Sequence, residues 1–278
     1  KGGGMATLPL AFLFPDGTPW GVRCVTTTGL CRTHAHLLFT VTPADPLAPV
    51  TGGAKFQLDG GPWIGSAPAV FEAHLIPPDN RSQVFTVNYD SFELMTPRPR
   101  TLCAAPWAVA ADGTHGMLEP FCMSLNVTVT QKPEPSTDGL QAHLLFGNWS
   151  VVCSAAFGRC RTLGHLALLA AAPGVVTPLA AGGALSFDEG RQWHEMGASA
   201  SWLSKFDQLD GRTYQRFHLA FDLPSPGATP PPRPSVCARA WMQDLSSGAL
   251  SDVDMRNCSK PHGCGAARSD TVRCWPLP

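Results

Sequence analysis

The sequence is poor in charge and lacks closely spaced cysteine pairs. Only 15% of its 278 residues are charged, and the formal net charge is −1. No electrostatic attraction to nucleic acid or to an anionic membrane is therefore expected. The tightest cysteine spacings are C-x5-C, at Cys258 and Cys264, and C-x6-C, which are poor spacings for zinc. We predict neither nucleic-acid binding nor a metal or other cofactor.

Long uninterrupted apolar runs are also missing. The longest, roughly residues 163–185, is broken by Pro173, Pro178 and several glycines, so it is not expected to span a membrane. Proline and glycine, 27 of each, leave little room for long helices. Whether a membrane anchor follows Pro278 stays open, and the glycine-rich start, residues 1–4, is typical of a linker or a processing remnant.

Familiar catalytic signatures are absent. No G-x-S-x-G motif occurs, since the nearest serine context, residues 197–201, lacks the closing glycine. His194-Glu195 does not begin an H-E-x-x-H motif, because position 198 is alanine. The sequence predicts no catalytic residues and no enzyme. A secreted hydrolase with an unrecognised site is kept as a lesser alternative.

Cysteines and glycosylation sequons indicate the compartment. Ten cysteines are an even and high number, and in an oxidising compartment they predict five disulfides. Four N-x-S/T sequons accompany them. Together they favour a secreted glycoprotein or the extracellular side of a membrane protein. The predicted glycosylation sites are Asn80, Asn126, Asn148 and Asn257.

One cysteine motif occurs twice. Residues 22–33 read VRCVTTTGLCRT, and residues 151–162 read VVCSAAFGRCRT, exactly 129 positions later. Each half continues with D-x3/4-W, C-A-x2-W and a further cysteine, which favours a tandem duplication over a single convoluted domain. Tryptophans retained in both copies are expected to pack in the two cores. They are Trp20, Trp63 and Trp107, and their partners Trp149, Trp193 and Trp241.

Short alternating segments indicate β-strands. Apolar and polar residues alternate in 85–92, 124–130 and 216–224, which is the period of half-buried strands. We predict an all-β chain of two tandem antiparallel β-sandwich domains of immunoglobulin or fibronectin III type. The predicted boundaries are 1–130 for the first repeat, 131–139 for a linker and 140–278 for the second repeat.

Disulfide connectivity cannot be read from sequence alone, because four cysteines in a repeat allow three pairings. We expect consecutive pairing, since a hairpin turn at Thr27-Thr28 would set residues 24 and 31 opposite each other. Crossed pairings that join the two sheets of a sandwich remain an alternative. The expected pairs are Cys24–Cys31, Cys103–Cys122, Cys153–Cys160, Cys237–Cys258 and Cys264–Cys274.

Residues 186–193, SFDEGRQW, fit the pattern S-x-D-x-G-x-x-W. This segment resembles the Asp-box hairpin of sialidases and sortilin-type receptors. The resemblance implies a structural turn in which Asp188 accepts hydrogen bonds from turn amides and Trp193 packs beneath. A glycan-contacting tip is the alternative interpretation. The first copy departs from the pattern, because the segment 58–63 is one residue shorter.

Two histidines and two tryptophans are further candidates for metal or partner binding. His34 and His36 share a strand face, but no acidic or cysteine partner stands nearby, so packing or surface roles are favoured over a metal. Trp202 and Trp275 have no counterpart in the other copy, which makes them the partner-binding candidates. The loops at 67–79 and 224–234 differ between the copies and are candidate partner surfaces.

These observations favour a binding protein. We predict recognition of an extracellular or cell-surface protein, by a receptor or adhesion ectodomain or by a secreted decoy. A viral decoy is included, because arginine outnumbers lysine 15 to 5, as in GC-rich coding sequences. The alternative is a lectin-like module that binds glycan through an aromatic platform near the two box-like hairpins.

Overall fold

The computed structural model describes residues 7–13, 20–26, 29–75, 81–94, 100–130, 140–171, 179–196, 200–209, 212–226, 235–256, 258 and 266–277. These residues form twenty strands and no helix, so the predicted all-β class is confirmed. In the described ranges, no helix is long and apolar enough to cross a membrane. Contacts between Cα atoms divide the chain into two compact units, residues 1–132 and 133–278. The predicted linker, 131–139, lies outside the described residues.

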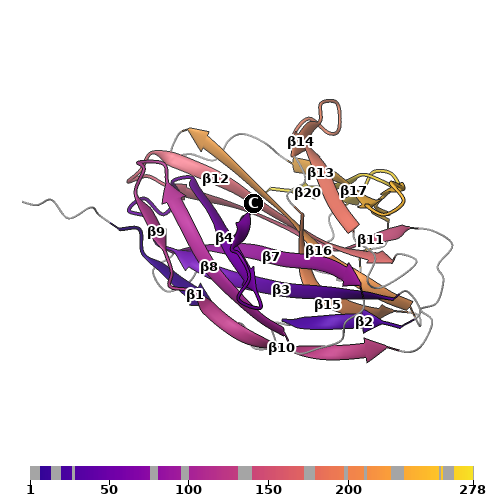
Figure 1. The fold of residues 1–278 in the computed structure, drawn as a ribbon. Coiled ribbons are helices and arrows are strands. Elements are labelled where there is room, and N and C mark those ends of the chain that lie inside the picture. Colours follow the sequence, from indigo (N-terminus) through magenta and orange to yellow (C-terminus); the bar gives the residue numbers. More distant parts are fainter. Residues whose placement is uncertain are drawn as a thin grey trace, which may run out of the picture. The chain divides into compact units, whose positions relative to one another are not determined.

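The first unit is a β-sandwich whose sheets share one strand (Figure 1). In β10, residues 121–125 pair with β8 in antiparallel fashion and residues 126–130 pair with β2 in parallel fashion. The expectation of purely antiparallel pairing is therefore wrong for the β10–β2 pair, and His143 and Asp254 of the second unit also form a parallel bridge. The strands are β1 (Leu10–Leu13), β2 (Gly21–Val25), β3 (Leu30–Val41), β4 (Val50–Leu58), β5 (Ile64–Pro68), β6 (Val70–Leu75), β7 (Gln83–Leu94), β8 (Arg100–Ala110), β9 (His115–Met117) and β10 (Phe121–Thr130).

Aromatic rings fill the space between the two sheets of this unit. Phe39 on β3 stacks on Phe85 on β7, with ring centroids 5.6 Å apart. Phe56 on β4 meets Tyr89 on β7 at 5.0 Å, so the contact joins one sheet to the other. All four are buried, because alternate residues of each strand point inward.

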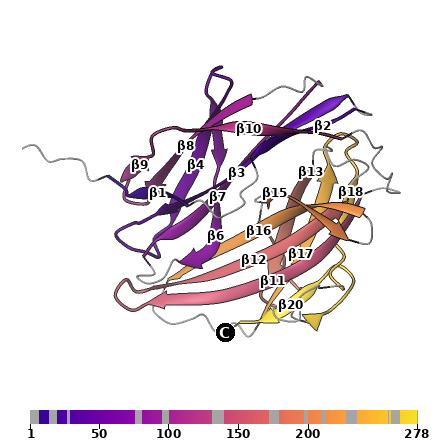
Figure 2. The same ribbon diagram turned by 90° about the horizontal axis from the view of Figure 1, so that it is seen from below.

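The second unit is a sandwich of two separate sheets, ordered β11-β12-β16-β15 and β14-β13-β17-β20-β19, with β18 on β17. In Figure 2 β13 and β17 lie behind β12 and β16. One buried cluster, which includes Leu166, Phe217, Leu185 and Met242, draws on both sheets. The strands are β11 (Gln141–Ser154), β12 (Arg159–Ala171), β13 (Leu179–Ser186), β14 (His194–Met196), β15 (Ala200–Leu209), β16 (Arg212–Pro226), β17 (Ser235–Asp244), β18 (Leu250–Asp252), β19 (Ala266–Ala267) and β20 (Arg273–Pro276).

The two units share an order of strand pairing. In the first unit β3 joins β2 to β7, β7 pairs with β6, and β4 joins β5 to β8, which also carries β9 and β10. The second unit repeats these seven pairings. In it β12 joins β11 to β16, β16 pairs with β15, and β13 joins β14 to β17, which also carries β18 and β20. This correspondence is what an ancestral duplication would produce.

Disulfides staple neighbouring strands in both units. The pairs Cys24–Cys31, Cys103–Cys122 and Cys153–Cys160 are as predicted. Cys237, however, is bonded to Cys274, so the predicted pairs Cys237–Cys258 and Cys264–Cys274 are wrong. The register explains the difference, because β20 places Cys274 directly opposite Cys237, as β10 places Cys122 opposite Cys103. Cys258 is also disulfide-bonded, whereas Cys264 lies outside the described residues.

The matched tryptophans do not share one environment. Trp20 and Trp149 are buried, as predicted. Trp107, Trp193 and Trp241 are only half-buried, and Trp63 is 40% exposed. The core prediction is wrong for Trp63, which lies in the β4–β5 connection, and β5 is the edge strand among the strands that the structure describes.

Candidate interaction surface

Exposed apolar side chains gather on one hairpin of each unit. Nine large apolar side chains are exposed among the described residues, and four of them lie on the β8–β9 hairpin or on its counterpart β17–β18. Scattered exposed apolar residues are ordinary, but a cluster is typical of a contact surface. The four are Val109 and Met117 in the first unit and Leu245 and Leu250 in the second.

The β8–β9 hairpin owes its shape to its turn. The Ala110 amide donates to the Thr114 carbonyl at 2.8 Å, and Gly113 supplies the left-handed backbone with a φ of 84°. The Thr114 amide donates to the Asp112 carboxylate at 2.9 Å. Hydrogen bonds from Thr114 lower the pKa of Asp112. The turn is therefore fixed by local bonds at neutral pH.

Alternation along β8 turns one tryptophan outward. Ala104 and Ala108 are fully buried, whereas Val109 is 37% exposed, so Trp107 shares the outer face with Val109. Its nearest neighbours on that face are Ala105 and Val109 along the strand, and Gly53 and Met117 across it. We call Trp107 and these four neighbours the Trp107 surface. Gly53 has no side chain, and the other four side chains are apolar.

A pocket of about 310 Å³ lies beside this hairpin. Its lining includes Ala110, Asp112 and Thr114 from the turn, and Leu8 and Pro9 from the preceding segment. The Leu8 amide donates to the His115 carbonyl at 3.0 Å, which fixes that segment against β9. A hollow whose lining includes the Asp112 carboxylate therefore lies beside the turn of this hairpin.

The β17–β18 hairpin has the same construction with different side chains. Ser246 and Ser247 donate backbone hydrogen bonds to the Asp244 carboxylate at 2.8 and 3.3 Å. Desolvation raises the pKa of Asp244, but these hydrogen bonds outweigh it and the net shift is downward. The hairpin therefore presents a fixed strand pair, in which Trp241 faces Asp252.

Trp241 stands where Trp107 stands in the first unit. Its neighbours on the outer face are Arg239 and Gln243 along β17, Gly182 on β13 and Asp252 on β18. We call Trp241 and these four residues the Trp241 surface. Three of the four neighbours are polar or charged, in contrast with the all-apolar set around Trp107.

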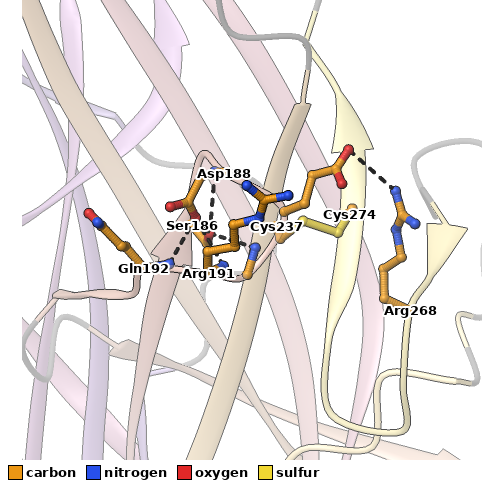
Figure 3. Close-up of a disulfide and its surroundings, with 9 residues drawn as sticks. Ser186, Asp188, Arg191, Gln192, Cys237, Arg268 and Cys274 are labelled. Carbon is orange, nitrogen blue, oxygen red and sulfur yellow. Dashed lines mark hydrogen bonds and ion pairs between the residues drawn. A yellow bond between two sulfur atoms is a disulfide. The ribbon is translucent and has the colours of Figure 1, made fainter.

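The Asp-box segment forms the expected turn (Figure 3). The Asp188 carboxylate accepts hydrogen bonds from the Ser186 hydroxyl at 2.6 Å and from the amides of Arg191 and Gln192 at 3.0 and 2.9 Å. The Ser186 hydroxyl bond, followed by the two amide bonds, lowers the pKa of Asp188. Trp193 packs near Gly190. The segment is thus a structural turn, held on the sheet next to the Cys237–Cys274 disulfide.

The first unit uses its matched aspartate differently. Asp59 has a φ of 52°, and its carboxylate accepts hydrogen bonds from the Thr101 amide at 2.9 Å and from Arg100 Nε at 2.5 Å. Arg100 also pairs with Glu93. The shorter box therefore ties the β4–β5 turn to the neighbouring strand.

The histidine pair lies inside the protein. His34 and His36 are both 7% exposed, and His36 Nδ1 lies 2.8 Å from Asn88 Oδ1. Burial, followed by the charges of Arg32 and Arg23, lowers the pKa of His34 to about 4, so its ring is neutral at pH 7. In the part of the chain that the structure describes, no group of three His, Cys, Asp or Glu side chains is arranged to hold a metal ion.

The two predicted contact tryptophans are not brought together on a surface. Trp275 is 4% exposed and lies 5.9 Å from Trp149 in the core, so its assignment as a partner-binding residue is wrong. The ring of Trp275 fills the space over Gly147, which accounts for its burial. Trp202 belongs to β15, and its side chain lies outside what the structure describes.

Other predicted positions are placed in part. Asn126 on β10 and Asn148 on β11 are exposed, whereas Asn80 and Asn257 lie outside the described residues. Of the candidate loops, residues 227–234 and 76–79 also lie outside them.

Sequence reasoning missed the outward-facing hairpin residues. The alternation of β8, where Ala104 and Ala108 are separated by Trp107 and Val109, carries a signal for them. The presence of a tryptophan at this place in both copies was interpreted as core packing, so the outward position of Trp107 was not predicted.

Comparisons with known proteins leave the family open. No protein-family model matches the chain, and no curated protein matches it. A solved structure of a cycloalternan-forming enzyme from Listeria monocytogenes aligns with a TM-score of 0.27 and 8% identity over 84% of this chain and 18% of that chain. The fibronectin(III)-like modules of Clostridium thermocellum CbhA align with a TM-score of 0.19 and 12% identity over 88% and 92%. The chain thus spans under a fifth of the Listeria enzyme.

Proposed function

We propose that this chain is an extracellular glycoprotein that recognises a protein partner, as a receptor or adhesion ectodomain or as a secreted decoy. The single observation that carries the proposal is the Trp107 surface. A half-buried tryptophan beside the exposed apolar side chains of Val109 and Met117 has the composition of an interface centre, where Trp dominates binding energy.

The surroundings of Trp107 favour a protein over a small ligand. Met117 is 66% exposed and Val109 is 37% exposed, on strands that are fixed by backbone pairing. Such a rigid apolar face loses little conformational entropy on binding. The pocket beside the hairpin turn, whose lining includes Asp112, offers a place for one anchoring side chain of the partner.

The compartment follows from the covalent chemistry. Disulfides persist in oxidising environments, and the structure joins cysteines in both units. Glycans at the exposed Asn126 and Asn148 would lie on β10 and β11, strands other than those that form the Trp107 surface.

Substitution on the hairpin tests the proposal. The secreted chain is prepared as a fluorescently labelled tetramer and screened against arrayed cell-surface and serum proteins. Its affinity for each protein that binds is then measured. We expect Met117→Glu and Val109→Glu to weaken binding at least tenfold, because a buried unpaired carboxylate opposes association. Val129→Glu is the matched control, since Val129 is 44% exposed on β10.

Two results would count against the proposal. If no arrayed protein binds the wild-type chain, protein recognition is not supported. If a partner binds and Val129→Glu weakens it as strongly as Met117→Glu does, the contact lies elsewhere than on the Trp107 surface.

A further inference from the structure

We infer that the Trp241 surface of the second unit is a binding site for a neutral glycan, with one pyranose ring stacked on the indole of Trp241. This activity is separate from the protein recognition proposed for the first unit. The inference starts from the way Trp241 lies on its sheet.

The indole of Trp241 lies on the backbone of β13. Its atoms Cζ2, Cε2 and Nε1 lie 2.5, 2.6 and 2.8 Å from the point where a Cβ of Gly182 would stand. Only glycine at position 182 lets the ring settle there without displacement. Trp241 is half-buried, so the contact with β13 holds the ring while part of it stays accessible to solvent.

Unused hydrogen-bonding groups border the ring. Asp252 is exposed and Gln243 is half-buried. Their register places both next to Trp241, one across the hairpin and one along β17. Among the described residues, neither side chain makes a hydrogen bond or an ion pair. A carboxylate and an amide are thus free to bind hydroxyl groups.

Arg239, the remaining charged neighbour of Trp241, bears on the charge of the ligand. Arg239 lies over the ring of Trp193, 4.9 Å from its centroid, and faces Glu195 at 3.7 Å. Arg239 therefore occupies one face of Trp193, the ring that the Asp-box hairpin suggested as a platform. Glu195 and Asp252 together outnumber this single cation, so the local charge disfavours acidic sugars.

A pyranose ring matches this arrangement. One face of the sugar presents C–H groups, which are attracted to the electron-rich face of an indole. Its rim presents hydroxyl groups, which donate to a carboxylate and exchange hydrogen bonds with an amide. A few placed polar groups around an apolar platform fix the orientation of a small ligand.

The first unit provides an internal comparison. Gln243 and Asp252 of the second unit correspond to Val109 and Met117 of the first, and Arg239 corresponds to Ala105. In both units a glycine lies directly opposite the tryptophan in the strand register, Gly53 in the first and Gly182 in the second. The two surfaces thus differ in the side chains that decide between an apolar partner and a hydroxyl-rich one.

A glycan array tests the inference. The full chain is applied to an array of neutral oligosaccharides, which includes maltotriose, cellotriose, mannotriose and N-acetyllactosamine, and of acidic ones such as 3′-sialyllactose. We expect binding to at least one neutral probe, with saturation transfer from the protein to the C–H protons of the sugar. Asp252→Asn and Gln243→Ala should each weaken that binding at least tenfold, and Trp241→Ala should abolish it.

Controls separate this site from the Trp107 surface and from misfolding. Trp107→Ala removes the matched tryptophan and should leave glycan binding unchanged. Asp252→Asn alters only an exposed side chain, so it tests the site even if Trp241→Ala does not fold. Glycan binding should also survive in Met117→Glu, whatever happens there to protein recognition.

Three results would overturn the inference. One is the absence of binding to every neutral probe, and another is binding that Asp252→Asn and Gln243→Ala leave intact. The third is binding confined to acidic probes that is lost in Arg239→Gln but retained in Asp252→Asn.

Discussion

The repeated C-R-T motif places buried polar residues in both units, Arg32 and Thr33 in the first and Arg161 and Thr162 in the second. Arg32 forms two hydrogen bonds with the Asp90 carboxylate, at 2.8 and 2.5 Å, which ties β3 to β7. Thr33 and Thr162, the threonines of the two copies, are buried, and among the described residues their hydroxyls have no hydrogen-bond partner. A buried hydroxyl without a partner lowers stability.

Replacing these threonines by valine should stabilise the chain. Thr33→Val and Thr162→Val each remove a desolvated hydroxyl and keep the branched shape, so each should raise the free energy of unfolding by about 1 kcal/mol. Denaturant unfolding measures the change. Thr42→Val is the matched control and should destabilise, because the Thr42 hydroxyl bonds to Ser82 at 2.8 Å. Destabilisation by Thr33→Val would show that its hydroxyl is satisfied.

Glycines beneath tryptophans are a second residue-scale feature. An added Cβ at Gly164 would overlap the ring of Trp149, which lies directly opposite in the register. Gly164→Ala should therefore lower the free energy of unfolding by about 1–3 kcal/mol through overpacking. Gly65→Ala should have little effect, since nothing lies within 4 Å of its added Cβ. Equal effects from the two substitutions in thermal denaturation would refute this account.

At the scale of elements, hairpin turns carry the surfaces. Asp112, Asp188 and Asp244 each accept backbone hydrogen bonds within a turn. Carboxylates are suited to this role because they accept several amide bonds at once. Each such turn fixes the strand pair beside it, and with it the side chains that the pair presents.

The Asp-box hairpin should open only in acid. The pKa of Asp188 is lowered in the folded chain, so its bonds stabilise the turn above the unfolded pKa. That stabilisation is lost as the pH falls through the lower, folded value. Protection factors for the Arg191 and Gln192 amides, from hydrogen exchange, should therefore persist below the ordinary pKa of an aspartate. In Asp188→Ala protection should be missing at every pH, and protection that survives there would contradict the assignment.

At the scale of the whole molecule, four disulfides lie within the two units in matching places. Each unit joins the strand that carries its outward-facing tryptophan to its last strand, through Cys103–Cys122 in the first and Cys237–Cys274 in the second. Closing loops in the unfolded chain is one way that disulfides stabilise a fold. The second unit carries extra chain before β20, which holds Cys258 and Cys264.

Peptide mapping of the secreted chain checks this layout. Under non-reducing conditions, mass spectrometry should find Cys237 linked to Cys274, and Cys258 linked to neither. Enzymatic release of N-glycans in heavy-oxygen water should convert Asn126 and Asn148 to labelled aspartate, because both side chains are exposed. A Cys237–Cys258 peptide, or an unmodified Asn126 and Asn148, would contradict the layout or the secretory assignment respectively.

Local pattern was enough for some of these features. Alternation over 85–92 and 216–224 predicted strands that the structure contains as β7 and β16. The short spacing between Cys24 and Cys31 predicted a hairpin disulfide, since only a hairpin brings such close positions face to face. The turn of SFDEGRQW was also predictable, because its hydrogen bonds join residues within eight positions.

The sequence by itself determined the all-β class, the doubled motif and the cross-linked hairpins, because each depends on residues that are close together in the chain. Tertiary structure decided that Cys274 pairs with Cys237, that Trp275 is buried and that Trp107 and Trp241 face outward. The physical reason is that strand register brings distant residues together. The side chains opposite a residue, rather than its own identity, determine whether it packs inside or meets a partner.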